Sequence, residues 1–241
     1  MKIKITGQKG SKEVDIYSKE GYELISELCL KTACQHRIMY EPTWLGIPII
    51  QFPNDIVMMQ ELIWKVRPDI IIETGVAHGG SAILYASILE LIGKGKVIGI
   101  DIEIRKYNRL AINSHPLSKR IHLIEGSSID TNIVERVKSM IKKDERVLAT
   151  FDSNHSYQHV LSEMELYSAL VSDDSYMVVM DGAQGLVWDI PDGKKEWKDD
   201  NPLIAIKEFL KCHPEWEEDS YYTRLGVTSS PKGFLKRVNE S

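Results

Sequence analysis

Residues 69–81 of the chain read DIIIETGVAHGGS, and this stretch decides the fold. Its first half is a run of isoleucines, a pattern typical of a short strand that is buried on both faces. Its second half is rich in glycine, which permits a tight turn, and it leads into SAILYASILELI (81–92). That apolar run predicts a helix, and Gly93 is suited to end it. A strand, a glycine turn and a helix in this order indicate the first unit of a parallel α/β sheet.

The same alternation continues toward the C-terminus. Four further buried-strand patterns follow, separated by helical patterns: KVIGID (96–101), IHLIE (121–125), VLATFD (147–152) and YMVVMD (176–181). Two last runs, YYTRLGVT (221–228) and GFLKRV (233–238), flank a Ser-Ser-Pro-Lys-Gly turn and predict an antiparallel hairpin. We therefore expect a Rossmann-like α/β fold, with a mostly parallel seven-stranded sheet, a C-terminal antiparallel hairpin and helices on both faces.

The N-terminal part has a different pattern. Apolar residues at helical spacing over 18–34 predict one helix, and a segment rich in proline and aromatic residues follows over 37–54. Asn54 and Asp55 are candidates to cap a second helix over residues 56–66.

Composition limits the class of protein and its partners. The chain has 241 residues, of which 43% are hydrophobic, and a net charge of −5, so one globular domain fits. The acidic balance argues against nucleic acid as a partner, and no apolar run is long enough for a transmembrane segment. Three cysteines make a poor disulfide framework, and the N-terminus lacks the apolar region of a signal peptide. These features predict a cytoplasmic protein.

Polar residues follow the first three strands, at the sheet edge where ligands of α/β folds bind. The first turn reads E-x-G-x-x-x-G-G where a dinucleotide site would have G-x-G-x-x-G, and its acid suits the ammonium and sulfonium of S-adenosylmethionine. Asp101 ends the second strand and is placed to accept the ribose hydroxyls, and Ser127 follows the third, near the expected adenine. The predicted cofactor-binding residues are Glu73, Gly75, His78, Gly79, Gly80, Ser81, Asp101, Ser127 and Ser128.

Two carboxylates and a histidine follow the fourth and fifth strands. Asp152 and Asp181 are hard oxygen ligands suited to Mg²⁺ or another divalent cation, so we predict that they hold a metal. His155 is a credible base for a substrate hydroxyl, and we predict a catalytic role for His155 and Asp152. A plainer interpretation makes Asp152 the cap of the next helix and His155 a polar loop residue.

Two loops are expected to cover the substrate, one over residues 184–200 and the other over residues 40–51. Large aromatic side chains commonly wall such pockets, and Trp44, Trp188 and Trp197 fall in loops, whereas Trp64 is expected to pack in the core.

Several segments together resemble the cephalosporin hydroxylase/rhamnosyl O-methyltransferase family: WLGIPIIQFPNDIVMMQELIWKVRPDIIIETGVAHGGSA (44–82), VIGIDIEIR (97–105), IEGSS (124–128), FDSNHSYQHVLSEMELYSALV (151–171) and YMVVMDG (176–182). The resemblance implies a class I methyltransferase that transfers a methyl group from S-adenosylmethionine to a hydroxyl of a sugar or related small molecule. It also implies a homo-oligomer.

The resemblance carries specific residue roles. Macrolide sugar O-methyltransferases have a D-x-x-H motif, matched here by Asp152 and His155, in which the aspartate binds Mg²⁺ and the histidine is the base. They also have paired acids after the fifth strand, where this chain has Met180 beside Asp181, so one acidic ligand is absent. We expect residues 1–55 to form an N-terminal helical and irregular extension that caps the site, and residues 56–241 to form the methyltransferase domain.

Two other readings stay open at this point. An NAD-linked oxidoreductase would use the same fold, although the G-x-G-x-x-G motif is missing. A non-catalytic scaffold that binds S-adenosylmethionine would retain the fold and lack the complete metal site.

Overall fold

A seven-stranded sheet runs through the centre of the molecule in this computed structural model, which describes residues 1–7 and 10–238. Its strand order is β10-β11-β9-β8-β5-β6-β7. Strands β5 to β9 are parallel, and β11 is antiparallel to both of its neighbours. The strands of the sheet are β5 (Ile70–Thr74), β6 (Lys96–Asp101), β7 (Ile121–Glu125), β8 (Val147–Phe151), β9 (Tyr176–Val179), β10 (Trp216–Glu218) and β11 (Phe234–Arg237).

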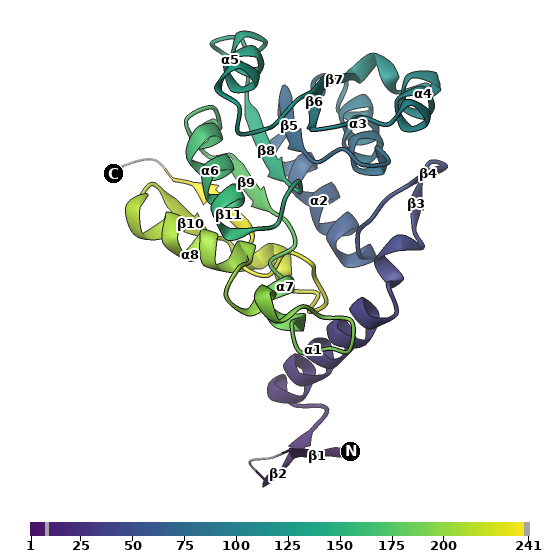
Figure 1. Ribbon diagram of the computed structural model, residues 1–241, viewed down its shortest axis with the longest axis vertical. Helices are drawn as coiled ribbons and strands as arrows, with labels where there is room; N and C mark the ends of the chain where they lie inside the picture. The colour runs from purple at the N-terminus through teal and green to yellow at the C-terminus, as the bar shows by residue number, and fades with distance from the viewer. Residues whose placement is uncertain (8–9, 239–241) are drawn as a thin grey trace.

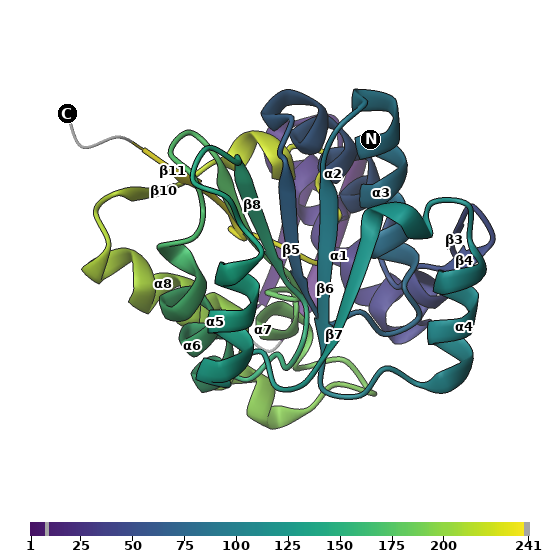
Figure 2. The same cartoon turned by 90° about the horizontal axis from the view of Figure 1, so that it is seen from above.

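Helices cover both faces of the sheet, as Figure 2 shows. On one face α2 and α3 pack against side chains such as Ile71, and on the other face α5, α6 and α8 pack against its neighbours Ile70 and Ile72. Successive strand residues point to opposite faces, so an uninterrupted isoleucine run supplies both cores. The helices are α1 (Lys19–Gln35), α2 (Pro53–Val66), α3 (Gly80–Ile92), α4 (Lys106–Ser114), α5 (Thr131–Ser139), α6 (Tyr157–Ser168), α7 (Gln184–Val187) and α8 (Pro202–Cys212), with 3-10 turns at Ile38–Tyr40, Ser118–Arg120, Lys195–Lys198 and Ser220–Thr223.

The expected α/β fold is confirmed, but one strand of the C-terminal hairpin was placed wrongly. The partner of β11 is β10, and residues 221–228 instead form a 3-10 turn and a loop. Tyr222 of that turn is buried and stacks on Phe234, while Arg224 pairs with Glu61 at 2.7 Å. These contacts with other elements outweigh the local strand pattern, because strand propensity depends strongly on packing.

The start of α2 also differs from the sequence expectation. The helix begins at Pro53, a favourable first position for proline, and neither Asn54 nor Asp55 caps it. Asp55 is buried instead, and its carboxylate accepts hydrogen bonds from the Thr228 hydroxyl and from the backbone and side chain of Ser229. Asp55 therefore ties α2 to the segment that precedes β11. Trp64, expected in the core, is 46% exposed.

Two hairpins that the sequence did not suggest lie on the N-terminal side. Strands β1 (Lys2–Gly7) and β2 (Gly10–Asp15) form an antiparallel pair at the far end of α1 from the sheet (Figure 1). The pair β3 (Thr43–Trp44) and β4 (Ile47–Pro48) lies between α1 and α2 along the chain. Helix α1 and the β3-β4 segment bring the N-terminal residues to the edge of the sheet where the site lies.

Candidate active site

The strand order reverses between β5 and β8, and a cavity opens beyond the carboxyl ends of these two strands. Chain connections leave β5 and β8 in opposite directions, so the loops that follow them part and leave space for a ligand. The cavity has a volume of about 560 Å³, which suits a small ligand. Of the residues predicted to bind a cofactor, substrate or metal, those that line it are Gly75, His78, Gly79, Gly80, Ser81, Asp152, His155 and Asp181.

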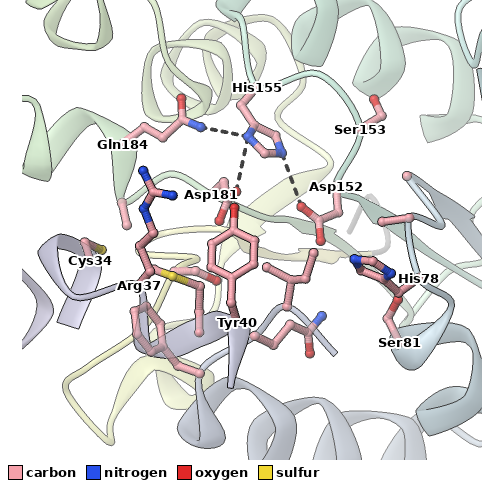
Figure 3. A pocket seen from close by; sticks show the side chains of 18 of the residues that line it. Cys34, Arg37, Tyr40, His78, Ser81, Asp152, Ser153, His155, Asp181 and Gln184 are labelled. Carbon is pink, nitrogen blue, oxygen red and sulfur yellow. Dashed lines mark hydrogen bonds and ion pairs between the residues drawn. The ribbon is translucent and has the colours of Figure 1, made fainter. Parts of the chain in front are cut away.

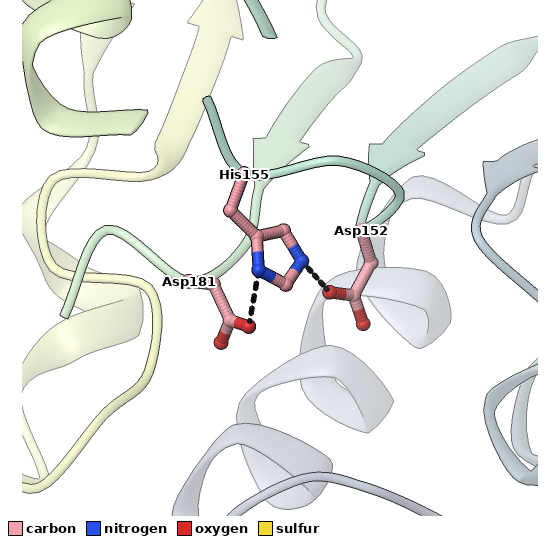
Figure 4. A group of neighbouring side chains, drawn as sticks. All are labelled: Asp152, His155 and Asp181. Carbon is pink, nitrogen blue, oxygen red and sulfur yellow. Dashed lines mark ion pairs between the residues drawn. The ribbon is translucent and has the colours of Figure 1, made fainter. Parts of the chain in front are cut away.

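Asp152, His155 and Asp181 lie close together and line this cavity (Figure 4). His155 Nε2 lies 3.3 Å from Asp152 Oδ1, and His155 Nδ1 lies 3.2 Å from Asp181 Oδ2. All three side chains are partly buried. Because β8 and β9 are adjacent and parallel, residues that follow them in the sequence come together at one edge of the sheet. The imidazole thus lies between two carboxylates.

Gln184, three residues after Asp181, adds a fourth group to this cluster. Its Nε2 lies 2.7 Å from His155 Nδ1 (Figure 3). The neutral imidazole with Nδ1 unprotonated accepts the amide proton of Gln184, whereas a protonated Nδ1 donates toward Asp181. His155 Nε2 is buried and has no hydrogen bond of good geometry within the described chain, and the carboxylate oxygen beside it is Asp152 Oδ1 at 3.3 Å.

Asp181 has a backbone conformation that is unfavourable for most residues, with φ at 55°. The surrounding chain holds it there, since the Ala183 amide donates to the Ser229 carbonyl at 2.9 Å and Ser229 is held by Asp55. Strained backbone of this kind persists only where neighbouring contacts fix it, and it is frequent at functional sites. Asp55 therefore supports the placement of Asp181 from behind.

The two carboxylates dominate the electrostatics of the cluster. Burial by itself lowers the pKa of His155. The carboxylates of Asp181 and Asp152 raise this pKa by more than burial lowers it, so it is about 9. Burial is the main cause that raises the pKa of Asp152. His155 opposes this rise and the nearby Asp181 carboxylate adds to it, and the resulting pKa is about 6. Two acids this close repel each other, and a cation between them removes the repulsion.

The donor atoms fit a divalent cation. Within residues 1–7 and 10–238, Asp152, His155 and Asp181 are the only group able to present three metal ligands, with donor atoms within 4.8 Å of one another. Two carboxylate oxygens are the ligands that Mg²⁺ prefers, and water or substrate oxygens complete its usual octahedron. Met180, beside Asp181, is buried in the core, and its sulfur accepts a hydrogen bond from the Ser230 hydroxyl.

A buried polar network supports the Asp152 loop from below, and sequence reasoning missed it. The Ser153 hydroxyl donates to Glu163 Oε1 at 2.7 Å, and the carboxylate of Glu163 is fully buried. His159 Nε2 lies 3.1 Å from the hydroxyls of both Ser153 and Ser128. His159 and Glu163 share one side of α6 because they are four residues apart, a spacing that offered the only sequence signal. The Ser128 hydroxyl thus faces His159.

The remaining predicted cofactor residues lie behind the cavity wall. Glu73 is only 1% exposed, and burial raises its pKa to about 8, so its carboxyl is neutral at pH 7. Asp101 Oδ2 accepts the backbone amides of Val76 and Ala77, each at 2.9 Å, and so shapes the glycine turn. Ser127, at the end of β7, does not line the cavity in the described chain.

Gly75 is the glycine that this turn requires most. Its φ is +87°, and a Cβ atom there would lie 1.9 Å from the Asp152 carbonyl oxygen. We expect Gly75→Ala to lower the free energy of unfolding by well over the cost of the left-handed backbone alone, which is about 1–2 kcal/mol. Urea denaturation measures this loss. Gly46→Ala is the matched control, since Gly46 has φ at +88° and open space around it. Equal losses in the two variants would refute the contact between Gly75 and the Asp152 backbone.

Comparison with known protein families identifies a match to most of the chain. The Rhamnosyl O-methyltransferase/CmcI family matches the chain over residues 36–238. The chain belongs to this family. The rhamnosyl O-methyltransferase of Mycobacterium tuberculosis strain H37Rv is 31% identical over 208 residues, covering 81% of this chain and 78% of that protein. The rhamnosyl O-methyltransferase of Mycobacterium leprae is 32% identical over 201 residues, covering 81% of this chain and 82% of that protein.

Solved structures share the fold. A structure of CmcI with Mg and SAM has a TM-score of 0.59 at 20% identity, covering 83% of this chain and 78% of that one. A CmcI structure with SAH has a TM-score of 0.60. As a member of the Rhamnosyl O-methyltransferase/CmcI family, the chain is an S-adenosylmethionine-dependent O-methyltransferase. The described chain contains no helix that is both long and apolar enough to cross a membrane.

Proposed function

We propose that this enzyme methylates a hydroxyl of a sugar, with Asp152 and Asp181 holding a divalent cation and His155 acting as base. The observation that carries the proposal is the position of His155 between two carboxylates, at the strand ends that border the glycine turn. The sugar acceptor is supported by the rhamnosyl O-methyltransferases that the chain resembles. S-adenosylmethionine supplies the methyl group and leaves as S-adenosylhomocysteine.

Residues on two sides of the cavity have different roles. On the β5 side, the glycine turn and Ser81 bind the amino-acid part of the cofactor, and Asp101 behind the turn serves the ribose. Ile102, which follows Asp101 and is 71% exposed, offers an apolar surface for the adenine and is a residue that the sequence argument did not single out. Glu73 and Ser128 are buried, so we propose that they support these walls, and Ser127, which follows β7, is kept as a proposed contact to the adenine.

On the other side, His155 receives the proton that the acceptor hydroxyl loses when its oxygen takes the methyl group. In the neutral tautomer that carries its proton on Nδ1, this nitrogen donates toward Asp181 Oδ2, and Nε2 is then the nitrogen that accepts the hydroxyl proton. Asp152 and Asp181 would hold a divalent cation, which would supply Lewis acidity that lowers the pKa of the acceptor hydroxyl. Asp152 takes part in catalysis by fixing both this cation and the His155 ring.

The N-terminal residues close the cavity over the acceptor. Cys34, Arg37 and Tyr40 come from α1 and the turn after it, and Gln51 comes from the segment before α2. We assign residues 1–55 to a capping extension on residues 56–241 for this reason. Of the tryptophans expected in the pocket wall, Trp197 lines the cavity, whereas Trp44 donates its indole N–H to Ser87 elsewhere. Residues 184–197 complete the cover.

Calorimetric titration of S-adenosylmethionine tests the cofactor assignment. We expect Asp101→Ala to weaken binding by about tenfold or more, because the variant loses a ribose partner and the acceptor of two turn amides. Glu103→Ala, two residues further along and exposed, is the matched control and is expected to bind normally. Absence of S-adenosylmethionine binding to the unaltered protein, with or without Mg²⁺, would refute the proposed function. Binding of a nicotinamide cofactor would instead revive the oxidoreductase.

We also propose that the enzyme works in the cytoplasm as a homo-oligomer, as the family resemblance suggests. Sedimentation velocity at micromolar protein concentration measures the assembly state directly. A single species with the mass of one chain would contradict the oligomer.

A further inference from the structure

Two positively charged side chains, Arg37 and Lys194, line the acceptor side of the cavity. Figure 3 places Arg37 near Cys34 and Gln184, on the opposite side of the Asp152–His155–Asp181 cluster from His78 and Ser81. The cofactor's amino-acid part, which lies with the glycine turn in the proposed function, is therefore on the other side. Arg37 therefore faces the space left for the acceptor, and Lys194 lines the same cavity.

Contacts between distant segments fix this wall. Lys31 of α1 pairs with Asp189 at 2.8 Å, and the Asp192 amide donates to the Gln35 side chain at 3.1 Å. Below these contacts, Leu30 of α1 belongs to an apolar cluster that also contains residues of the 183–197 segment. The wall is therefore a built surface in which α1 and residues 184–197 hold their cationic side chains toward one cavity.

Neither cation is neutralised by the described part of the protein. No carboxylate of residues 1–7 or 10–238 lies within 4.0 Å of the charged nitrogens of Arg37 or Lys194. Lys194 Nζ instead lies 5.6 Å from the centre of the Trp197 ring. Asp192 is the one acid on this wall, and it is exposed and makes no ion pair with either cation in that part of the chain.

Arg37 also occupies a conformation that costs energy. Its φ is 54°, in the left-handed position just after α1 where glycine or asparagine is usual. Backbone strain of this kind is frequent at ligand-binding sites, and the strained residue here carries a long cationic side chain that lines the cavity. Tyr40, 59% exposed, and Trp197 line the same side and offer aromatic faces of the kind that pack against sugar rings.

We propose that the acceptor is an acidic saccharide, whose carboxylate or phosphate is bound by Arg37 and Lys194 while a hydroxyl of its ring meets His155. Guanidinium and ammonium groups bind such anions through charge-assisted hydrogen bonds. The aromatic side chains select a sugar ring and the two cations select its negative charge. This inference rests on the proposed function and adds the class of its substrate.

A matched set of sugars tests the proposal on protein saturated with S-adenosylhomocysteine. The probes are methyl β-glucopyranoside, which is neutral, methyl β-glucuronopyranoside, which carries a carboxylate, and glucose 1-phosphate. We expect at least one acidic probe to bind about tenfold more tightly than the neutral glycoside in calorimetric or NMR titrations. The preference should weaken as salt is added. The two acidic probes distinguish a carboxylate acceptor from a phosphorylated one.

The double variant Arg37→Gln/Lys194→Gln is expected to lose this preference while it binds the neutral glycoside as before. Lys198→Gln is the matched control, because Lys198 belongs to the same 3-10 turn as Trp197, just after the 184–197 segment, and does not line the cavity. Equal binding of acidic and neutral sugars, or of none of the three probes, would overturn the proposal. So would a preference that survives in the double variant.

Titration with the cofactor separates this proposal from the proposed function. If Arg37→Gln weakens S-adenosylmethionine binding, Arg37 serves the cofactor's carboxylate, and the acidic-acceptor proposal fails while the methyltransferase stands. Failure of the unaltered protein to bind S-adenosylmethionine or S-adenosylhomocysteine contradicts the proposed function itself. Normal cofactor binding together with an unchanged sugar preference in the double variant contradicts only the acceptor class.

Discussion

Replacing His155 with glutamine is expected to lower kcat for methyl transfer by about 10²–10⁴-fold, the usual contribution of a general base. Glutamine retains a polar side chain that Gln184 and Asp152 can still contact, but it cannot accept the hydroxyl proton at neutral pH. Binding of S-adenosylmethionine should be unchanged, because Asp152 lies between His155 and the glycine-turn residue His78 (Figure 3). Release of S-adenosylhomocysteine under saturating substrate measures kcat.

The pH profile gives this prediction a second readout. A base is active in its neutral form, so the rate supported by His155 rises as pH increases through the pKa of its imidazole. Without added cation that pKa is about 9, because Asp181 and Asp152 stabilise the protonated ring against the effect of burial. We expect the midpoint of the profile to fall when Mg²⁺ is added, since the cation offsets both carboxylates. His122→Gln, a histidine outside the cavity, serves as the control. An unaltered rate in His155→Gln would exclude His155 as the base.

The candidate cluster was accessible to sequence reasoning because it depends on strand ends. Asp152 and Asp181 each follow a buried strand, and parallel strands present their carboxyl ends at one edge. Asp101 was placed at the cofactor edge of the sheet for the same reason, and its carboxylate meets the amides of Val76 and Ala77 in the glycine turn. Such predictions require only the direction of the strands and the side of the sheet on which ligands bind.

Residues that act through tertiary contacts were not accessible in this way. Arg37 and Lys194 line the same cavity although they are 157 positions apart, and nothing local connects the end of α1 to the 184–197 segment. Asp55 carries a capping pattern, yet its carboxylate binds Ser229, which is 174 positions away. Strand β10 has only three residues, too few for the alternation that reveals a strand. Local patterns fix the elements, whereas these positions depend on which elements pack together.

Replacing Asp181 with asparagine is expected to weaken Mg²⁺ binding by more than about 100-fold, since changes in the outer shell of metal sites alone cost about 10–100-fold. The turnover rate should fall together with the Mg²⁺ affinity. Asparagine matches aspartate in shape and tolerates the left-handed backbone that Asp181 adopts, so the variant removes charge without added strain. Calorimetric titration of Mg²⁺ into protein saturated with S-adenosylhomocysteine measures the affinity.

The same substitution has an effect that requires no metal. The Asp181 charge is one of the main causes that raise the pKa of His155, so Asp181→Asn is expected to lower that pKa from about 9 toward its ordinary value. NMR titration of the His155 ring in chelator-treated protein follows this change. Asp192→Asn is the matched control, because Asp192 lines the cavity but lies outside the three-residue cluster. A lower His155 pKa with unchanged Mg²⁺ affinity would retain the electrostatic pairing and exclude Asp181 as a metal ligand. If Asp181→Asn lowers both the His155 pKa and the Mg²⁺ affinity while Asp192→Asn changes neither, both effects are assigned to the Asp181 carboxylate.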